Sequence, residues 1–185
     1  MYRSVICALA IAAGLNAGLA AKEKSVMVGG AAMYPTKNII ENAVNSKDHT
    51  TLVAAVKAAG LVETLQGKGP STVFAPTNAA FDKLPSGTVD MLLRPDHKEM
   101  LGKVLTYHVV AGKWDAKALM KTAEKAGGTV ELDTVSGGKL WVMVHGGALM
   151  LKDEKGMTAQ VTTPDVYQSN GVIHVIDTVI LPPKS

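Results

Sequence analysis

The stretch "NGVIHVIDTVILP", residues 170–182, decides the fold because it has the composition of a buried strand. It is apolar and β-branched, with Asn-Gly before it and Pro-Pro after it, and these are typical strand boundaries. Side chains of a strand alternate between two faces, so His174 shares one face with valine and isoleucine. Asp177 shares the other face with valine, isoleucine and leucine. Both faces are apolar, and the strand is therefore expected to lie in the interior, covered on both sides.

His174 and Asp177 are the two titratable side chains in this run. A buried polar group without a partner costs about 1–3 kcal/mol, so we expect both to be hydrogen-bonded. Burial also favours the neutral form of His174. Asp177 lies nearer the end of the strand, where it could instead face solvent or pair with neighbouring backbone.

The chain before this strand changes character halfway along. Helical periodicity dominates residues 36–128, apart from a short strand at 71–75, and helix signals include Thr77 as a cap and Gly60 as a stop. Short strand-like runs separated by glycine turns dominate residues 129–163. Helices first and hairpins later predict an α+β domain over residues 36–182, with the 71–75 strand joining a mostly antiparallel sheet.

The N-terminal residues have a different composition. Residues 1–20 carry Arg3, a short apolar run and small residues before a cleavage point after Ala20, which predicts a signal peptide. A membrane-spanning helix is disfavoured because the apolar run is shorter than the roughly 20 residues needed to span a bilayer. Residues 21–35 contain charges and Gly-Gly without a period, and we expect them to form an exposed leader. The single cysteine, Cys7, lies within the predicted signal.

Composition and charge narrow the class of protein. With 47% hydrophobic and 19% charged residues the chain is expected to be globular. Removal of residues 1–20 takes away Arg3 and no acidic residue, which leaves 18 basic and 16 acidic side chains. The lysines are spread along the chain, so nothing indicates nucleic-acid binding, and later segments are too short to span a membrane.

Three segments resemble the signature motifs of the fasciclin (FAS1) domain. They are "STVFAPTNAAFDKL" at 71–84, "YHVVAG" at 107–112 and the strand at 170–182. The segments occur in the family's order, and the resemblance covers about residues 34–182. It implies a wedge of two β-sheets with several helices packed at one side, of the small single-domain type that bacteria secrete.

The resemblance also implies a role and a surface. It implies an exported cell-adhesion or interaction module, secreted, periplasmic or at the cell surface, that binds a surface protein or a polysaccharide. Two places match family positions that are linked to partner binding. The first comprises Pro164, Asp165 and Val166, and the second is the pair Tyr107 and His108. Asp165 also follows a proline in a polar stretch, which is common in turns for local reasons.

A structural role is predicted for the polar residues of the three motifs. His108 lies at helical spacing from Leu101, Val104 and Leu105, which places it on an apolar helix face. We therefore expect Thr77, Asn78, His108, His174 and Asp177 to supply hydrogen bonds that join helices to sheet.

Other classes of function have little support in the sequence. The chain lacks a Gly-x-Ser-x-Gly nucleophile motif and the His-Glu-x-x-His zinc motif, and its five histidines are scattered. We expect no enzyme activity, no metal and no cofactor. The alternative function is a periplasmic small-ligand-binding protein with an apolar pocket, and the oligomeric state is left open.

Overall fold

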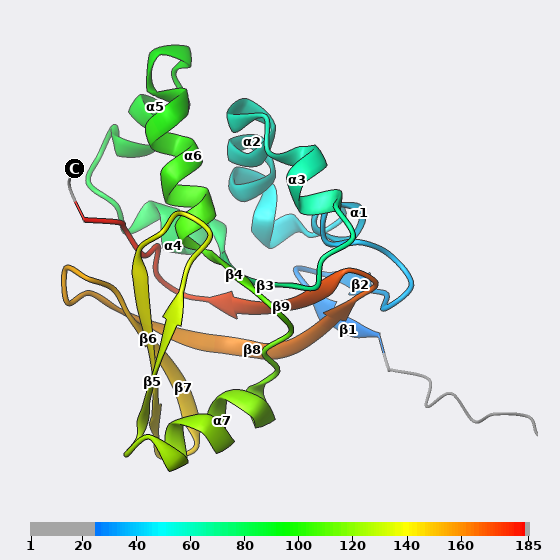
Figure 1. Ribbon diagram of the computed structural model, residues 1–185. Coiled ribbons are helices and arrows are strands. Elements are labelled where there is room, and N and C mark those ends of the chain that lie inside the picture. The colour runs from blue at the N-terminus through cyan, green and yellow to red at the C-terminus, as the bar shows by residue number, and fades with distance from the viewer. Residues whose placement is uncertain (1–24, 184–185) are drawn as a thin grey trace, which may run out of the picture.

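The computed structural model describes residues 25–183, so the predicted signal peptide at residues 1–20 lies outside the described part of the chain. Seven strands form a mixed sheet in the order β4-β3-β9-β8-β7-β6-β5, and two more form a small separate hairpin (Figure 1). The strands of the larger sheet are β3 (Ser71–Pro76), β4 (Val109–Ala111), β5 (Thr129–Asp133), β6 (Lys139–His145), β7 (Ala148–Lys152), β8 (Thr158–Gln168) and β9 (Gly171–Ile176).

The large sheet bends into two halves that share the long strand β8. In one half, β9 and β3 are parallel, with Ser71 opposite Gly171 and Pro76 opposite Ile176. Strand β4 is antiparallel to β3. In the other half β5, β6, β7 and β8 form an antiparallel meander. A bridge between Val110 and Thr134 brings β4 close to β5, so the wedge approaches a closed barrel. The predicted α+β wedge is confirmed.

Helices cover the sheet unequally. Figure 1 shows α1 to α6 gathered on one side of β3 and β9, whereas α7 lies alone on the other side, beneath β8. The helices are α1 (Ile39–Ala43), α2 (Thr50–Ala59), α3 (Val62–Gln66), α4 (Asn78–Asp82), α5 (Thr88–Leu92), α6 (Lys98–Tyr107) and α7 (Ala116–Lys125), with 3-10 turns at Lys47–His49 and Pro95–His97.

The two faces of β9 belong to two different hydrophobic cores. Ile173 and Val175 pack into the core beneath helices α1, α2 and α6. Ile176 packs into the second core, between α7 and the inner face of the β5–β8 half of the sheet. Every residue of β9 is buried, which confirms the expectation of an interior strand.

Local signals set several helix ends. Thr77 accepts a hydrogen bond from the Ala80 amide and caps α4, as predicted. Gly60 ends α2 with a positive φ of 73°, which glycine adopts without strain. Helix α1 is capped by Asn38, because Asn38 and Glu41 form a reciprocal capping box.

The segment predicted to be an exposed leader differs from that expectation. Residues Val26–Val28 (β1) and Ala31–Met33 (β2) form an antiparallel hairpin. Val28 and Met33 are buried and belong to the core beneath the helices. The apolar runs are only three residues long and are separated by Gly29 and Gly30, which make the turn of the hairpin. The sequence of this segment therefore resembles a loop.

The segment around Pro164 and Asp165 also differs from a simple turn. It belongs to β8, and the pairing of β8 with β9 shifts register between Thr163 and Val166. Asp165 has a positive φ of 57° at this irregularity. The turn-forming residues therefore mark a bulge within a long strand rather than its end.

Candidate functional site

His174 is completely buried and uses both ring nitrogens. Its Nδ1 accepts a hydrogen bond from the Asp165 amide at 3.3 Å, and its Nε2 donates to the Trp114 carbonyl at 2.7 Å. The ring also stacks on Phe74, with centroids 5.6 Å apart. Burial lowers the pKa of His174, although the Trp114 carbonyl opposes this. A neutral imidazole with the proton on Nε2 fits these partners, because a proton on Nδ1 would face the Asp165 N–H.

Asp165 directs its carboxylate at the start of helix α7. Its Oδ1 accepts a hydrogen bond from the Ala116 amide at 2.6 Å, while Asp115 caps the same helix by accepting from the Ala118 amide. The positive helix end favours both carboxylates. The Asp165 side chain thus connects β8 to α7 by a hydrogen bond, and the Asp165 backbone N–H connects β8 to His174.

His108 joins helix α6 to the C-terminal segment. Its Nδ1 donates to the Val104 carbonyl at 2.8 Å, and its Nε2 accepts from the Ile180 amide at 3.2 Å. Burial lowers the pKa of His108 to about 4. This ring is also held neutral, in the tautomer opposite to that of His174.

Tyr107 is buried beside the turn that connects β5 and β6. Its hydroxyl donates to the Lys139 carbonyl at 2.6 Å and accepts from the Glu154 amide at 3.2 Å. Burial raises its pKa to about 12. A Cβ on Gly138 would lie only 2.8 Å from the ring, so glycine there allows the turn to close over Tyr107.

Asn78 joins three elements on the helical side. Its Oδ1 accepts from the Thr51 amide at 3.0 Å and from the Thr50 hydroxyl at 3.2 Å, and its Nδ2 donates to the Lys47 carbonyl at 2.8 Å. Since the Thr77 amide donates to the Ile176 carbonyl, this pair of residues connects α4 to both α2 and β9.

Asp177 lies at the end of β9, partly exposed. Its Oδ1 accepts from the Gln160 amide at 2.8 Å, and its Oδ2 lies 3.3 Å from the Lys83 ammonium. Partial burial acts to raise the pKa of Asp177, but the bonds from Gln160, Thr178 and Lys83 outweigh it and lower the pKa. This is the pairing with neighbouring backbone that the sequence left open.

Three of the five predicted contact residues are buried in the structure. Tyr107 and His108 are buried, and Val166 is buried in the core beneath the helices, so none of the three reaches a partner in this conformation. The polar side-chain atoms of Tyr107 and His108 are hydrogen-bonded inside the fold, and the aliphatic side chain of Val166 packs in the core. Pro164 is exposed, and a contact through it stays a prediction.

A small cavity lies in the core beneath α1 and α2. Its volume is about 30 Å³, and its walls are mostly aliphatic, with His49 and His108 also among the lining residues. His49 is buried, with Ser46 as the partner of its Nδ1 at 2.9 Å and no hydrogen bond of ordinary geometry to its Nε2. Burial lowers the pKa of His49, opposed by the Ala75 carbonyl. His49 was not among the residues predicted to have a functional or structural role.

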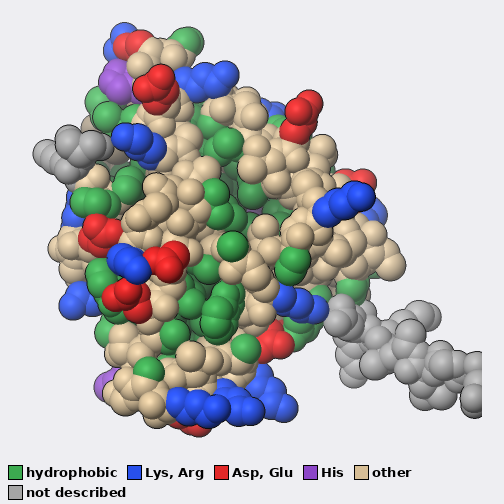
Figure 2. All heavy atoms as spheres, in the orientation of Figure 1, with side chains coloured by type: hydrophobic (Ala, Val, Ile, Leu, Met, Phe, Trp, Pro, Cys, Tyr) green, Lys and Arg blue, Asp and Glu red, His purple; other side chains and the backbone are tan. Residues whose placement is uncertain are grey.

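The outer face of β5, β6 and β7 carries the residues that sequence reasoning missed. Inward side chains such as Leu140 and Val142 are completely buried, so the alternate residues Trp141 and Met143 point outward and are half-buried. Acidic and basic side chains alternate over β5 and β6 in Figure 2. We call this surface the outer face. The regular alternation in "KLWVMVH" was the available signal.

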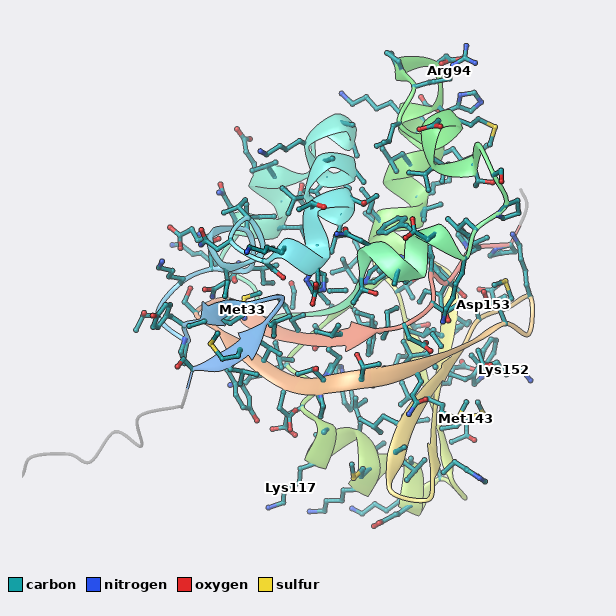
Figure 3. The ribbon with its side chains drawn as sticks, turned by 180° about the vertical axis from the view of Figure 1, so that it is seen from behind. Met33, Arg94, Lys117, Met143, Lys152 and Asp153 are labelled. Carbon is teal, nitrogen blue, oxygen red and sulfur yellow. The ribbon has the colours of Figure 1, made fainter. Side chains whose placement is uncertain are left out.

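A cleft of about 480 Å³ lies on the outer face, and we call it the Trp141 cleft. Figure 3 shows Met143 and Lys152 on the same side of β6 and β7, with Asp153 beyond them. The lining residues are Thr129, Trp141, Met143, Lys152, Asp153, Glu154, Lys155 and Gly156.

Two further properties concern residues 25–183 only. Within that range, no cluster of three or more histidine, cysteine, aspartate or glutamate side chains is arranged to hold a metal ion. No helix in the same range has the length and apolarity needed to cross a membrane.

Comparison with known proteins places this geometry in a family. The model of the fasciclin domain matches residues 47–182. The protein sll1483 of Synechocystis is 48% identical over 161 residues, which are 87% of this chain and 82% of that protein.

Two other similar proteins carry descriptive names. The cell surface glycolipoprotein MPB83 of Mycobacterium bovis is 40% identical over 66% of this chain, which spans only 48% of that protein. A FAS1 domain pair from the insect cell adhesion molecule fasciclin I has the same fold, with a TM-score of 0.69 and 22% identity over 78% of this chain and 51% of the pair. This chain belongs to the fasciclin domain family.

Proposed function

We propose that this protein is an exported interaction module that binds a protein or glycan partner at the cell surface or in the surrounding matrix, without catalysing a reaction. The observation that carries the proposal is the outer face, where Trp141, Met143 and Met150 are half-buried and surrounded by charged residues. Aromatic and methionine side chains within a polar rim are the usual anatomy of a binding surface. Kinship with a cell surface glycolipoprotein and with a cell adhesion molecule supports the same class.

The two buried histidines of the fasciclin motifs, His108 and His174, support a structural role for these segments. His108 and His174 each have both ring nitrogens hydrogen-bonded inside the protein. A neutral, fully paired imidazole holds backbone segments in place and has no free lone pair or proton for chemistry. The motif residues then fix the sheet that presents the outer face.

The alternative of a small-ligand-binding protein has less support. The core cavity of about 30 Å³ compares with roughly 300–1,000 Å³ for ordinary ligand pockets. It is close to the volume of about one water molecule. The adhesion class is therefore the proposal that we carry forward.

The test is binding of chain 21–185 to separated cell-envelope fractions and to extracellular polysaccharide. Trp141→Ala removes the centre of the outer face, and Met100→Ala, at another exposed apolar position on α6, is the matched control. We expect saturable binding that Trp141→Ala weakens and Met100→Ala does not, with similar melting temperatures. Saturable binding that ignores Trp141→Ala would move the surface elsewhere, and no saturable binding to any fraction would overturn the proposal.

A further inference from the structure

Strand pairing places two methionines of the outer face directly opposite each other. Met143 in β6 pairs with Met150 in β7, and both side chains are half-buried. Residues in this relation have Cβ atoms about 5 Å apart. Methionine has a flexible, unbranched side chain, so the two thioether sulfur atoms can reach a single point above the sheet. The next residues in the same row across the sheet, Thr129 in β5 and Gln160 in β8, are neutral.

His145 lies on the same face at the end of β6. It follows Met143 by two residues, and alternate residues of a strand point to the same side of the sheet. Its partner across the hairpin is Ala148, which has a short side chain. His145 is exposed and is a diagonal neighbour of Met150, a relation that long side chains span across about 7–8 Å. We call Met143, His145 and Met150 the methionine site.

The charge around the methionine site favours a cation over an anion. The charged side chains beside it, on the outer face and in the Trp141 cleft, include more carboxylates than ammonium groups. They are Glu131, Asp133, Asp153 and Glu154, and Lys139, Lys152 and Lys155. Hydrogen bonds from backbone amides leave a carboxylate charged, so these surroundings carry a small negative excess.

Trp141 borders the methionine site on the side opposite to His145. It precedes Met143 by two residues and therefore shares its face of the sheet. Glu131 accepts a hydrogen bond from the Trp141 indole N–H at 3.1 Å, which fixes the ring in place. The face of an indole ring attracts a nearby cation, so Trp141 adds to the preference for positive charge.

The side chains of the methionine site form a neutral and soft set of metal ligands. Thioether and thiolate ligands select copper(I), whereas an imidazole suits several transition metals. Zn²⁺ is usually held by thiolates, imidazoles and carboxylates, and Ca²⁺ and Mg²⁺ are held by oxygen atoms. Two thioethers and one imidazole therefore fit a soft monovalent cation better than a divalent one.

We propose that the methionine site binds copper(I), with the sulfur atoms of Met143 and Met150 and a ring nitrogen of His145 as its ligands. This inference goes beyond the proposed function, because metal binding needs no protein or glycan partner. The exposed position of His145 leaves the site open to solvent, so an ion enters without unfolding of the sheet. Local sequence patterns do not indicate the site, since the two methionines become neighbours only through the β6–β7 hairpin.

The experiment measures copper(I) binding by chain 21–185 in competition with the chromophoric chelator bicinchoninate, under anaerobic conditions and without an affinity tag. This chain contains no cysteine, because the single cysteine is Cys7. Methionine is therefore its only source of sulfur ligands. X-ray absorption of the copper-loaded wild-type chain shows whether sulfur lies at bonding distance from the metal, and this measurement does not depend on the folding of any variant.

Two pairs of substitutions are compared. Met143→Leu with Met150→Leu removes both sulfur atoms and nearly conserves side-chain volume, so the fold should be kept. The matched control is Met91→Leu with Met100→Leu, because both methionines are exposed, on α5 and α6. Met100 also follows His97 by three residues, so the control pair has a histidine nearby in sequence as well.

We expect the wild-type chain to bind one equivalent of copper(I), with sulfur at bonding distance. Met143→Leu with Met150→Leu should weaken binding at least about tenfold, and His145→Gln should weaken it as well. The control pair should have little effect, and an equal concentration of Zn²⁺ should not displace the copper.

Four results would overturn the inference. They are no saturable binding of copper(I), equal weakening by the two methionine pairs, an absorption spectrum without sulfur, and displacement of copper by equimolar Zn²⁺. Envelope binding measured in the presence of the chelator tests the adhesion proposal separately. Its loss would leave the copper site intact, and failure of the copper test would leave the adhesion proposal intact.

Discussion

At the residue scale, the polar side chains of the motifs form hydrogen bonds between segments that are distant in sequence. His174 is the clearest case, because its two ring nitrogens join β8 to the segment before α7. Each bond contributes about 1 kcal/mol, and leaving a buried partner unpaired costs more. These hydrogen bonds therefore matter mainly because they leave no buried donor or acceptor unpaired.

Asp165 provides the test at this scale. Asp165→Ala removes the acceptor of the Ala116 amide and places alanine at a φ of 57°, which is unfavourable for it. We expect a loss of about 1–3 kcal/mol in the free energy of unfolding, measured by urea denaturation. Asp165→Asn keeps an acceptor oxygen and tolerates this φ, so it should lose less. Unchanged stability of Asp165→Ala, together with weakened partner binding, would instead make Asp165 a contact residue.

At the scale of elements, the β1–β2 hairpin closes the core on the helical side. It contributes Val28 and Met33 to the same hydrophobic cluster as α1 and α2. In addition, the Lys47 amide donates to the Gly29 carbonyl, which holds the turn of the hairpin against the 3-10 turn before α2. Residues 26–33 thus belong to the folded domain, and the domain begins earlier than residue 36.

Substitution of two methionines of the hairpin tests whether residues 26–33 belong to the folded domain or form an exposed leader. Met33 is 3% exposed and Met27 is 64% exposed. Met33→Ala should lower the free energy of unfolding by about 2–5 kcal/mol, since it leaves a cavity. Met27→Ala should change it by less than about 0.5 kcal/mol. Chemical denaturation of both variants decides the matter, and equal small effects would mean that the hairpin is not part of the cooperative unit.

At the scale of the whole molecule, three buried histidines make stability depend on pH. Burial lowers the pKa of His49, His108 and His174 below the ordinary value of 6.5. The unfolded chain therefore takes up protons before the folded protein does. The stabilisation is complete above pH 6.5 and is lost as the pH falls through 6.5 towards the folded-state pKa values.

The size of this effect follows from His108, whose folded-state pKa is about 4. That residue alone accounts for about 3 kcal/mol between pH 6.5 and 4. Urea denaturation at a series of pH values should show a flat region above pH 7 and a steep fall below it. His108→Gln should flatten the fall, whereas His145→Gln, at an exposed position, should not. Equal slopes for the three proteins would show that His108 is not the titrating group.

The sequence by itself determined the class of fold and most of its elements. The period of the apolar residues, the caps and the glycine stops are local properties, so β3, α4, α6, α7 and the β5–β7 meander were predictable. The interior position of the 170–182 strand followed from its two apolar faces. The family resemblance was carried by the same segments, and the fasciclin match confirms it.

Only the tertiary structure decided which polar residues are free to act. Asp165, Tyr107 and His108 look like contact residues in the sequence, but packing turns their polar atoms towards amides and carbonyls of other segments. The Trp141 cleft depends on strand register, because the pairing of β6 with β7 places Trp141 opposite Lys152 and Met143 opposite Met150. Pairing across the sheet is a long-range property, because it joins residues that local sequence patterns treat separately, and this is the physical reason that the site could not be predicted.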